Sequence, residues 1–390
     1  MLAAIIVLGS AVRLLIGVAT HGDRFDMESY GIVATATSNG DLFSAYAEIN
    51  GGEVARWPYP PGFWPVVAAA HWLEGRTGIS LATLIHVPLV AADATLALLV
   101  WGFLARRGAG RARRLAGAAL VALGPGFGVV SGYHGHFDAV AILPAVAALV
   151  IWEGRASQRR ASTAGALVGL GAALKTVPIV MLIALLPSLR SRRQALTVTI
   201  SALAVPLLLL APFALTTIDG LGPVVEYEGV GGLGGLSLVA QPNLAALYVQ
   251  GADVGISPLT EALLDYGSVL TAAALLLLAA LLLRWRTPAV QAAVLVWLAV
   301  YVFGYTFAFH YFVWGLPFFI MAGYLRAALF LQLALLLPLV IQYTGPHGPA
   351  YTIAYVALMV GVWLALLIAL GRLVGRARDE ARGSLAPAKA

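Results

Sequence analysis

The stretch VGLGAALKTVPIVMLI, residues 168–183, places Lys175 in the middle of an apolar run. A cation at the centre of a membrane helix costs about 2.5–3.5 kcal/mol on insertion scales, so this lysine requires a structural or functional reason. Pro178 follows three residues later. Proline removes a backbone donor and disfavours helical geometry in the residue before it. The stretch therefore predicts a helix that is broken near Lys175.

Composition places the whole chain among polytopic membrane proteins. Of its 390 residues, 61% are hydrophobic and 11% are charged, and its mean hydropathy is +0.89. The chain has no cysteine, which excludes disulfides and thiolate metal sites. The net charge of +6 is carried by short arginine clusters, a pattern typical of membrane orientation rather than of nucleic-acid binding. Frequent arginine and alanine indicate a bacterial source, so we expect a multi-pass protein of the bacterial plasma membrane.

The arginine clusters predict the topology, because positively charged loops stay in the cytoplasm. Each interval between neighbouring clusters must then hold an even number of crossings. The clusters lie at 106–114, 155–160, 190–193, 284–286, Arg326 and 371–382. Two helices are expected in each of the intervals 115–154, 194–283, 288–325 and 327–371. With the segments discussed next, the chain is predicted to have about 12 transmembrane helices.

The interval 161–189 has cytoplasmic clusters at both ends but is too short for two spans of about 20 residues. Parity therefore favours a broken hairpin of two short helices, with Lys175 at its apex. Broken helices are tolerated at membrane depth only where protein or a polar cavity surrounds them. The alternative is a lysine that snorkels from the end of an ordinary span.

The N-terminal segment is interpreted as a first helix rather than a signal peptide, since it lacks a basic start and a small-residue cleavage site. Parity then leaves 21–80 as one large outer loop. Interfacial helices are predicted around 26–38 and 61–74. Three tryptophans are expected to anchor this loop at the membrane interface: Trp57, Trp64 and Trp72.

We expect one transmembrane catalytic domain over 1–371, followed by a cytoplasmic polar tail over 372–390. A second large outer loop is predicted at 216–260, rich in glycine. On this topology most groups capable of chemistry gather on the outer face, and the cytoplasmic face offers almost only arginine. A cavity that opens outward is therefore the expected site.

Three carboxylates, Asp23, Asp26 and Glu28, follow the first helix directly. A carboxylate at the lipid interface that faces inward can act as a general base on an alcohol. Together with a neighbour it can also hold a cation. The alternative is a solvated loop whose aspartates cap a helix.

The outer turn YHGHFD brings together His134, His136 and Asp138. This spacing could form a metal site with carboxylates, or the two histidines could donate hydrogen bonds to a phosphate. Alternatively, Asp138 caps the helix that begins there. His310 and Tyr311 lie at another outer turn, where they could contact a substrate or belong to an aromatic belt.

Asp93 lies in the middle of an apolar helix, in VAADATLALL. An ionisable group at this depth is expected to be paired. The candidate partners are His86, one to two turns earlier, and Arg13 in the first helix.

Several of these motifs, in this order, resemble the GT-C superfamily of membrane glycosyltransferases, and its mannosyltransferase-like branch most closely. The motifs are DRFDMES (23–29), WPYPPGFWP (57–65), YHGHFDAVAILPAVAAL (133–149) and AGALVGLGAALKTVPIVMLIALLP (164–187), with fainter matches in VEYEGVGGLGGLS (225–237) and FHYFVWGLPF (309–318). Members of this superfamily take a sugar from a polyprenyl-phosphate carrier on the outer side of the membrane.

The resemblance implies a polyprenyl-phosphate sugar donor, a lipid-linked glycan or other hydroxyl acceptor, and contact with membrane lipid. It implies Asp26 as the general base, supported by Glu28 or Asp23, in a transfer that inverts the sugar. Lys175 would hold the donor phosphate, and that dianion would offset the cost of its buried charge. The remaining implied substrate-binding residues are His134, His136, Asp138, Tyr59, His310, Tyr311 and Glu228.

No cofactor and no obligatory metal are expected, because a monophosphate leaving group clamped by lysine lowers the need for Mg²⁺. The sequence has no glycine pattern of a nucleotide-binding domain, so a nucleotide-sugar donor is not expected either. The alternative function is a secondary transporter of a small polar or anionic solute, which also fits twelve helices, broken spans and an intramembrane lysine. The long first outer loop, the lack of visible repeats and the polar groups on one face favour the glycosyltransferase.

Overall fold

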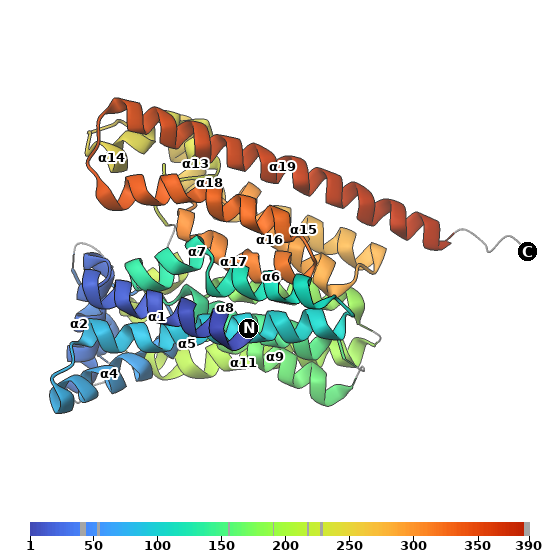
Figure 1. Cartoon of the computed structure of the whole chain (residues 1–390), viewed down its shortest axis with the longest axis horizontal. Coiled ribbons are helices and arrows are strands. Elements are labelled where there is room, and N and C mark those ends of the chain that lie inside the picture. The colour runs from blue at the N-terminus through green and yellow to red at the C-terminus, as the bar shows by residue number, and fades with distance from the viewer. Residues whose placement is uncertain are drawn as a thin grey trace, which may run out of the picture. The chain divides into compact units, whose positions relative to one another are not determined.

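The computed structural model describes residues 1–39, 44–52, 55–154, 157–189, 191–216, 218–226 and 229–385. Within these residues every regular element is helical, which confirms the all-α prediction (Figure 1). Packing divides the chain into two compact units. Unit 1 comprises Met1–Leu182 and Arg190–Tyr227, and unit 2 comprises Ile183–Leu189 and Glu228–Ala390. That the whole of 1–371 acts as one catalytic domain stays a prediction.

Seven helices in the described residues are long and apolar enough to cross a membrane: Leu2–Thr20, Leu81–Arg106, Arg111–His134, Arg192–Thr216, Pro258–Trp285, Leu325–Thr344 and Pro349–Arg382. These helices fit the prediction of a multi-pass membrane protein. Four further predicted crossings form shorter apolar helices of 10–17 residues, at Asp138–Trp152, Val177–Ser188, Ala289–Phe303 and Phe312–Met321. At 1.5 Å per residue such helices are shorter than the roughly 30 Å hydrocarbon core. Helix length therefore supports seven spans within the described residues, and the predicted count of twelve stays a prediction.

Unit 1 contains the first apolar helix, the helices of the loop predicted at 21–80 and a group of packed apolar helices. Its elements are α1 (Leu2–Thr20), α2 (Arg24–Ser38), α3 (Ala45–Asn50), η1 (Pro61–Phe63), α4 (Trp64–Thr77), α5 (Leu81–Arg106), α6 (Arg111–Ala122), α7 (Pro125–Phe127), η2 (Gly128–His134), α8 (Asp138–Trp152), α9 (Gln158–Leu174), η3 (Val177–Val180), the start of α10 (Met181–Leu185), α11 (Arg192–Thr216), η5 (Ile218–Leu221) and α12 (Gly222–Glu226). The helices predicted around 26–38 and 61–74 are present as α2 and as η1 with α4.

The break predicted at Lys175 is confirmed. Helix α9 ends at Leu174, and Lys175 has an extended backbone with φ −152° and ψ 131°. Short helical pieces follow, and η3 packs back against α9. Only 3% of Lys175 is exposed, so the alternative of a lysine snorkelling from an ordinary span is wrong.

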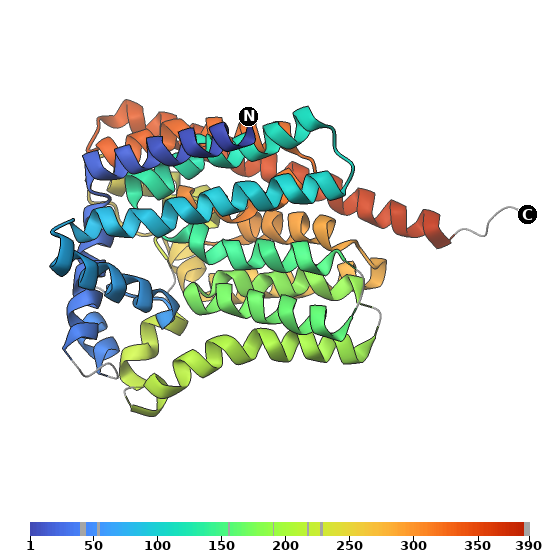
Figure 2. The same cartoon turned by 60° about the horizontal axis from the view of Figure 1, so that its bottom comes forward.

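Helix α9 packs closely on its neighbours because it presents glycines to them. A β-carbon at Gly165 would lie 2.3 Å from the Val198 carbonyl oxygen, and one at Gly169 would lie 2.4 Å from that of Ala202. Glycines four residues apart allow helix backbones to approach in this way inside membranes. Helices α8, α9 and α11 accordingly run side by side (Figure 2).

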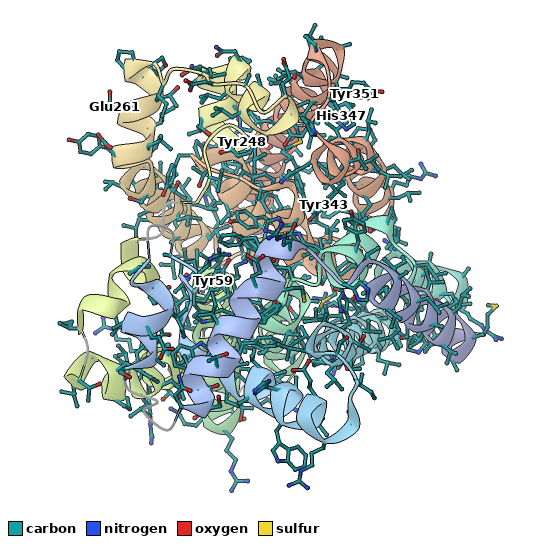
Figure 3. The ribbon with its side chains drawn as sticks, turned by 90° about the vertical axis from the view of Figure 1, so that its left-hand side faces the viewer. Tyr59, Tyr248, Glu261, Tyr343, His347 and Tyr351 are labelled. Atoms are coloured by element: carbon teal, nitrogen blue, oxygen red, sulfur yellow. The ribbon has the colours of Figure 1, made fainter. Side chains whose placement is uncertain are left out.

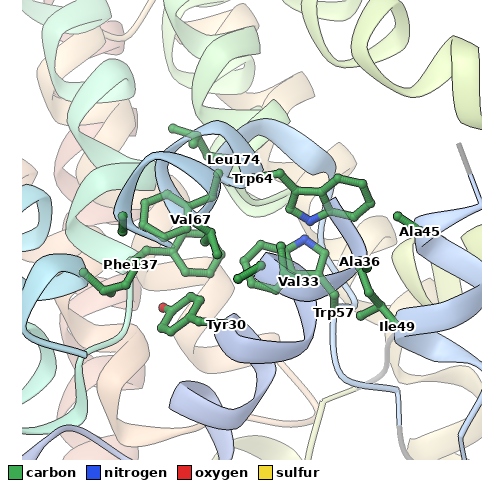
Figure 4. Packing of buried hydrophobic residues seen from close by; sticks show 14 of the residues in the cluster. Tyr30, Val33, Ala36, Ala45, Ile49, Trp57, Trp64, Val67, Phe137 and Leu174 are labelled. Atoms are coloured by element: carbon green, nitrogen blue, oxygen red, sulfur yellow. The ribbon is translucent and has the colours of Figure 1, made fainter. Parts of the chain in front are cut away.

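An aromatic core joins the helices between α1 and α5 to the longer apolar helices of unit 1 (Figure 4). The Phe63 ring stacks on Phe137 at 4.7 Å, and Trp57 stacks on the same ring at 5.4 Å. Trp57 and Trp64 are 1% and 3% exposed. The prediction that they anchor the membrane interface is therefore wrong, because their rings fill this core, whereas Trp72 is 58% exposed.

Unit 2 consists of five longer helices and the short helices before them. Its elements are the end of α10, η4 (Leu186–Ser188), α13 (Gly235–Ala240), η6 (Pro242–Leu244), α14 (Ala245–Val249), α15 (Pro258–Trp285), α16 (Ala289–Phe303), η7 (Phe309–Tyr311), α17 (Phe312–Met321), α18 (Leu325–Thr344) and α19 (Pro349–Leu385). The predicted loop 216–260 thus carries several short helices. The predicted tail 372–390 begins as a continuation of α19.

The turn between α18 and α19 is held by α14. The His347 amide donates to the Val249 carbonyl oxygen at 2.6 Å, and the His347 ring stacks on Tyr351 at 4.5 Å. Figure 3 shows His347 and Tyr351 together at one end of unit 2, near Tyr248 of α14. Because both Arg326 and the cluster at 371–382 are predicted to be cytoplasmic, this turn between them is predicted to face outward.

Candidate functional site

The first part of the site is positioned by the turn that leads from α1 into α2. His21 and Gly22 have positive φ angles of 62° and 82°, which end α1 and redirect the chain. Asp23 then caps α2, because its carboxylate accepts hydrogen bonds from the amides of Phe25 and Asp26. The Asp23 amide donates to the His134 carbonyl oxygen at 2.7 Å. The turn after α1 is therefore tied directly to the YHGHFD turn.

The YHGHFD turn places its two histidines through an irregular backbone. Residues 128–134 form the π-helical segment η2, a conformation frequent at functional sites. Gly135 follows with φ +77°, where a β-carbon would lie 2.5 Å from the Met27 methyl carbon. A glycine is thus favoured between His134 and His136, because its backbone adopts a positive φ that side chains with a β-carbon rarely tolerate.

Asp26 and His134 form the partly exposed end of the site. The Asp26 Oδ2 lies 2.6 Å from His134 Nε2 and 4.0 Å from His136 Nε2. The Asp26 side chain is 18% exposed, and that of His134 is 11% exposed. A carboxylate and an imidazole at this distance can share a proton, which is the arrangement that general acid–base chemistry uses.

Lys175 and Asp138 form the buried end. The Lys175 Nζ donates to Asp138 Oδ1 at 2.7 Å, and the two side chains are 4% and 0% exposed. Asp138 is the first residue of α8, but its carboxylate does not cap that helix. The capping alternative is therefore wrong. In this structure a carboxylate neutralises the lysine, so no phosphate is needed to offset its buried charge.

His136 connects the two ends. Its Nδ1 lies 3.3 Å from Asp138 Oδ1, and its Nε2 lies 3.5 Å from the Tyr59 hydroxyl. The Lys175 ammonium lies over the Tyr59 ring, 4.9 Å from its centroid. Five of the predicted site residues are thus joined in a row of contacts: Asp26, His134, His136, Asp138 and Lys175. Tyr59 contacts two of them.

Tyr30, which the sequence did not indicate, supports this row from α2. Its hydroxyl donates to the Gly135 carbonyl oxygen at 3.1 Å. Burial raises the pKa of Tyr30 well above its usual range, and the carboxylates of Asp26 and Asp138 raise it further. The phenol therefore stays protonated and keeps this hydrogen bond. Its position one turn after Asp26 on α2 is the signal that could have identified it.

Glu28 lies on the opposite side of α2 from the site. Residues two apart on a helix are rotated by about 200°, so Asp26 and Glu28 cannot share a face. The Glu28 carboxylate contacts Arg24 at 2.7 Å and Arg56 at 3.4 Å, and 43% of its side chain is exposed. The hydrogen bond from Arg24 is the main cause that lowers the pKa of Glu28. The structure therefore gives Glu28 surface ion pairs and gives Asp23 a capping contact.

Three other substrate-binding residues were predicted: His310, Tyr311 and Glu228. His310 and Tyr311 belong to unit 2, where the Tyr311 ring stacks on Trp314 at 4.1 Å. This stacking fits the aromatic alternative for that turn. Glu228 lies outside the described residues. The substrate-binding role of these three residues stays a prediction.

Asp93 has the partner that the sequence suggested. Its Oδ2 lies 3.2 Å from the Nε atom of Arg13, and both side chains are buried. Arg13 also donates to the carbonyl oxygens of Val121 and Ala122, each at 2.7 Å. His86 instead contacts the Ala82 carbonyl oxygen in its own helix. The Arg13–Asp93 pair therefore links α1, α5 and α6.

One set of donors in unit 1 could hold a metal ion. Ligand atoms of Asp23, Asp26 and His134 all lie within 4.8 Å of one another. Carboxylate oxygens and an imidazole nitrogen are common ligands of divalent cations. The Asp23 carboxylate is already engaged by backbone amides. The expectation that no metal is required stays a prediction.

Comparisons with known proteins assign no family. No family model matches the chain, and no curated protein matches it. The resemblance to GT-C enzymes consequently rests on the motifs quoted above. The functional proposal depends on the geometry of the site.

Proposed function

We propose that this chain is an integral membrane glycosyltransferase of GT-C type. It moves a single sugar, for which mannose is the first choice, from a polyprenyl-phosphate donor to an acceptor hydroxyl on the outer face of the plasma membrane. The observation that supports this most is the Asp26 carboxylate, which lies just beyond an apolar helix and 2.6 Å from His134 while remaining partly exposed. A base in this position can be reached by a donor from the lipid bilayer and by an acceptor from the bilayer or from water.

In the proposed reaction Asp26 takes the proton of the acceptor hydroxyl. The acceptor oxygen forms a bond to the anomeric carbon as the bond from that carbon to the phosphate oxygen breaks. The electron pair of the broken bond leaves with the polyprenyl phosphate, and the sugar is inverted. Proton transfer by a positioned side chain contributes about 10²–10⁴-fold to a rate.

The remaining residues hold charge around this step. His134 orients the Asp26 carboxylate and can accept its proton afterwards. His136 and Tyr59 offer hydrogen-bond donors for the leaving phosphate. The Lys175–Asp138 pair fixes His136 through the 3.3 Å contact between Asp138 and its Nδ1. In this geometry Lys175 contributes through Asp138, and direct contact with phosphate would require Asp138 to release it.

The proposal includes twelve spans with cytoplasmic arginine clusters and an active site that faces outward. The shorter apolar helices support it, because they occupy intervals in which parity requires a crossing. Short or broken helices at membrane depth occur where protein surrounds them. The buried Lys175 at such a break fits that requirement.

The test is sugar transfer in membranes that carry the full chain. The donor is radiolabelled short-chain polyprenyl-phosphate mannose, and total lipid extract supplies acceptors. Asp26→Asn should lower transfer by about 10²–10⁴-fold, since the base is lost while the shape is kept. The matched control is Glu48→Gln, which neutralises an exposed carboxylate in the same outer segment and should leave transfer intact.

Two outcomes would contradict the proposal. Full transfer by a folded Asp26→Asn variant would remove Asp26 as the base. If the wild type transfers no sugar from polyprenyl-phosphate mannose, glucose or arabinose, the proposed glycosyltransferase function is wrong. A loss in Glu28→Gln equal to that in Asp26→Asn would instead return Glu28 to the reaction.

The same residues support one other function, a secondary transporter. Ionisable groups in contact at membrane depth form the proton relays of such proteins, and the row from Asp26 to Lys175 has that chemistry. Proton-driven solute uptake by proteoliposomes, abolished in Lys175→Met, would favour the transporter. Sugar transfer without any uptake would exclude it.

A further inference from the structure

Unit 2 contains an apolar hollow between α16, α18 and α19 that the proposed reaction does not use. Its volume is about 250 Å³. Small side chains leave this space, because Ala327 of α18 and Ala365 and Ala369 of α19 line it where larger residues would fill it. Leucine and phenylalanine side chains form much of the remaining wall. Helices α18 and α19 run side by side along it (Figure 1).

One end of the hollow is basic. Arg372 and Arg376 line it one helical turn apart on α19, and both are exposed. A smaller hollow of about 90 Å³ adjoins this end, lined by polar groups that include Gln291 and Glu380. Tyr324 and Arg376 line both hollows. Two arginines against one glutamate leave this end with a net positive charge.

We propose that this hollow is a binding site for an anionic phospholipid. One acyl chain lies along the apolar wall, and the lipid phosphate lies between Arg372 and Arg376, with the Tyr324 hydroxyl in reach of the head group. Basic pockets between membrane helices on the cytoplasmic side are typical sites for anionic head groups. Both arginines belong to the cluster that the positive-inside rule assigns to the cytoplasm, where anionic lipid is available.

The dimensions favour part of a lipid over a compact solute. Pockets that enclose a drug-sized ligand begin at about 300 Å³, so this hollow suits a segment of an acyl chain whose remainder lies in the bilayer. The guanidinium groups prefer phosphate, which they bind through several N–H donors. A zwitterionic lipid has the same chain, but its head group is neutral overall. The site should therefore select by head-group charge.

This inference does not depend on sugar transfer. The hollow lies wholly in unit 2, at the end of the helices predicted to be cytoplasmic, and the proposed reaction uses unit 1 on the outer side. Loss of lipid binding with normal transfer, or the reverse, would separate the two proposals.

The test is native mass spectrometry of the purified full chain with equal amounts of phosphatidylglycerol and phosphatidylcholine that carry the same acyl chains. The wild type should retain phosphatidylglycerol preferentially. Arg372→Gln and Arg376→Gln should each weaken its retention about five-fold, and both together about twenty-five-fold. The matched control is Arg378→Gln, since Arg378 is on the same helix but pairs with Asp379 and does not line the hollow.

Ala369→Leu provides an independent variant, because it fills the hollow without changing charge. It should weaken retention of both lipids, whereas glycerol phosphate without acyl chains should fail to displace phosphatidylglycerol from the wild type. Equal retention of the two lipids by the wild type would overturn the proposal. An equal loss in Arg378→Gln would do so too, since the effect would then be a general one of positive charge. Displacement by glycerol phosphate would show a phosphate site that does not use the hollow.

Discussion

The Lys175–Asp138 pair should behave as a single neutral unit in the stability of unit 1. The Nζ and Oδ1 atoms are 2.7 Å apart, and both side chains are almost fully buried. At an effective dielectric constant of about 20 their gross attraction is roughly 6 kcal/mol. Desolvation costs several kcal/mol for each ion, so the net contribution of the intact pair is small. Removing one partner leaves the other charge buried, which should cost about 3–5 kcal/mol of unfolding free energy.

The measurement is a double-mutant cycle on the full chain in detergent. Lys175→Met and Asp138→Asn should each lower the unfolding free energy by about 3–5 kcal/mol, whereas the double variant should recover most of this loss. Asparagine is chosen because it can keep the contact to His136. Unfolding is followed by tryptophan fluorescence, for which the chain has nine tryptophans.

A surface pair of equal length provides the control. The Arg24 Nε and Glu28 Oε1 are also 2.7 Å apart, but their side chains are 92% and 43% exposed. Water and salt screen such a pair, so Arg24→Gln should leave stability almost unchanged. The reasoning is refuted if Lys175→Met is no more harmful than Arg24→Gln, or if the losses in the double variant simply add.

Three further predictions concern the surroundings of the site. Gly62→Ala should destabilise the chain by about 1–3 kcal/mol in the same unfolding assay, because the new β-carbon would lie 2.4 Å from the Ala173 carbonyl oxygen; an unchanged midpoint would contradict this contact. The wild type should lose stability as the pH rises above about 10, where unfolded tyrosine ionises but folded Tyr30 does not, and Tyr30→Phe should flatten that slope between pH 9 and 11. Asp93→Asn should cost about 3–5 kcal/mol, since it leaves the Arg13 charge buried without its carboxylate, and a midpoint equal to the wild type would show that the carbonyl contacts suffice.

The fold class and most helix positions could be predicted because they depend on local composition. Apolar runs predict helices, and Pro178 predicts the break after Leu174. The pairing of Asp93 with Arg13 could also be predicted, since buried charges in membranes need partners. The same rule applied to Lys175 could have suggested Asp138. Instead, the phosphate of the donor was predicted as the partner of Lys175.

The direction in which individual side chains point was predicted wrongly from the sequence in several places. Asp23, Asp26 and Glu28 look equivalent along the chain, but α2 turns them toward a cap, the site and the surface. Trp57 looks like an interface anchor, yet it lies in the aromatic core. Helix periodicity separates Asp26 from Glu28, but only the packing of α2 decides which of the two faces the site.

The sequence by itself determined that this is an all-helical, multi-pass membrane protein with a break at Lys175, because hydropathy, charge clusters and proline act on the chain locally. Only the tertiary structure decided which polar groups meet. The contacts that run from His134 through Asp26, His136 and Asp138 to Lys175 join three separate segments of the chain. Their meeting depends on the left-handed turn at Gly135 and on close helix packing at glycines, and both are set by long-range contacts. The physical reason is that a charge in an apolar protein is stabilised by the partner that packing brings to it, wherever that partner lies in the sequence.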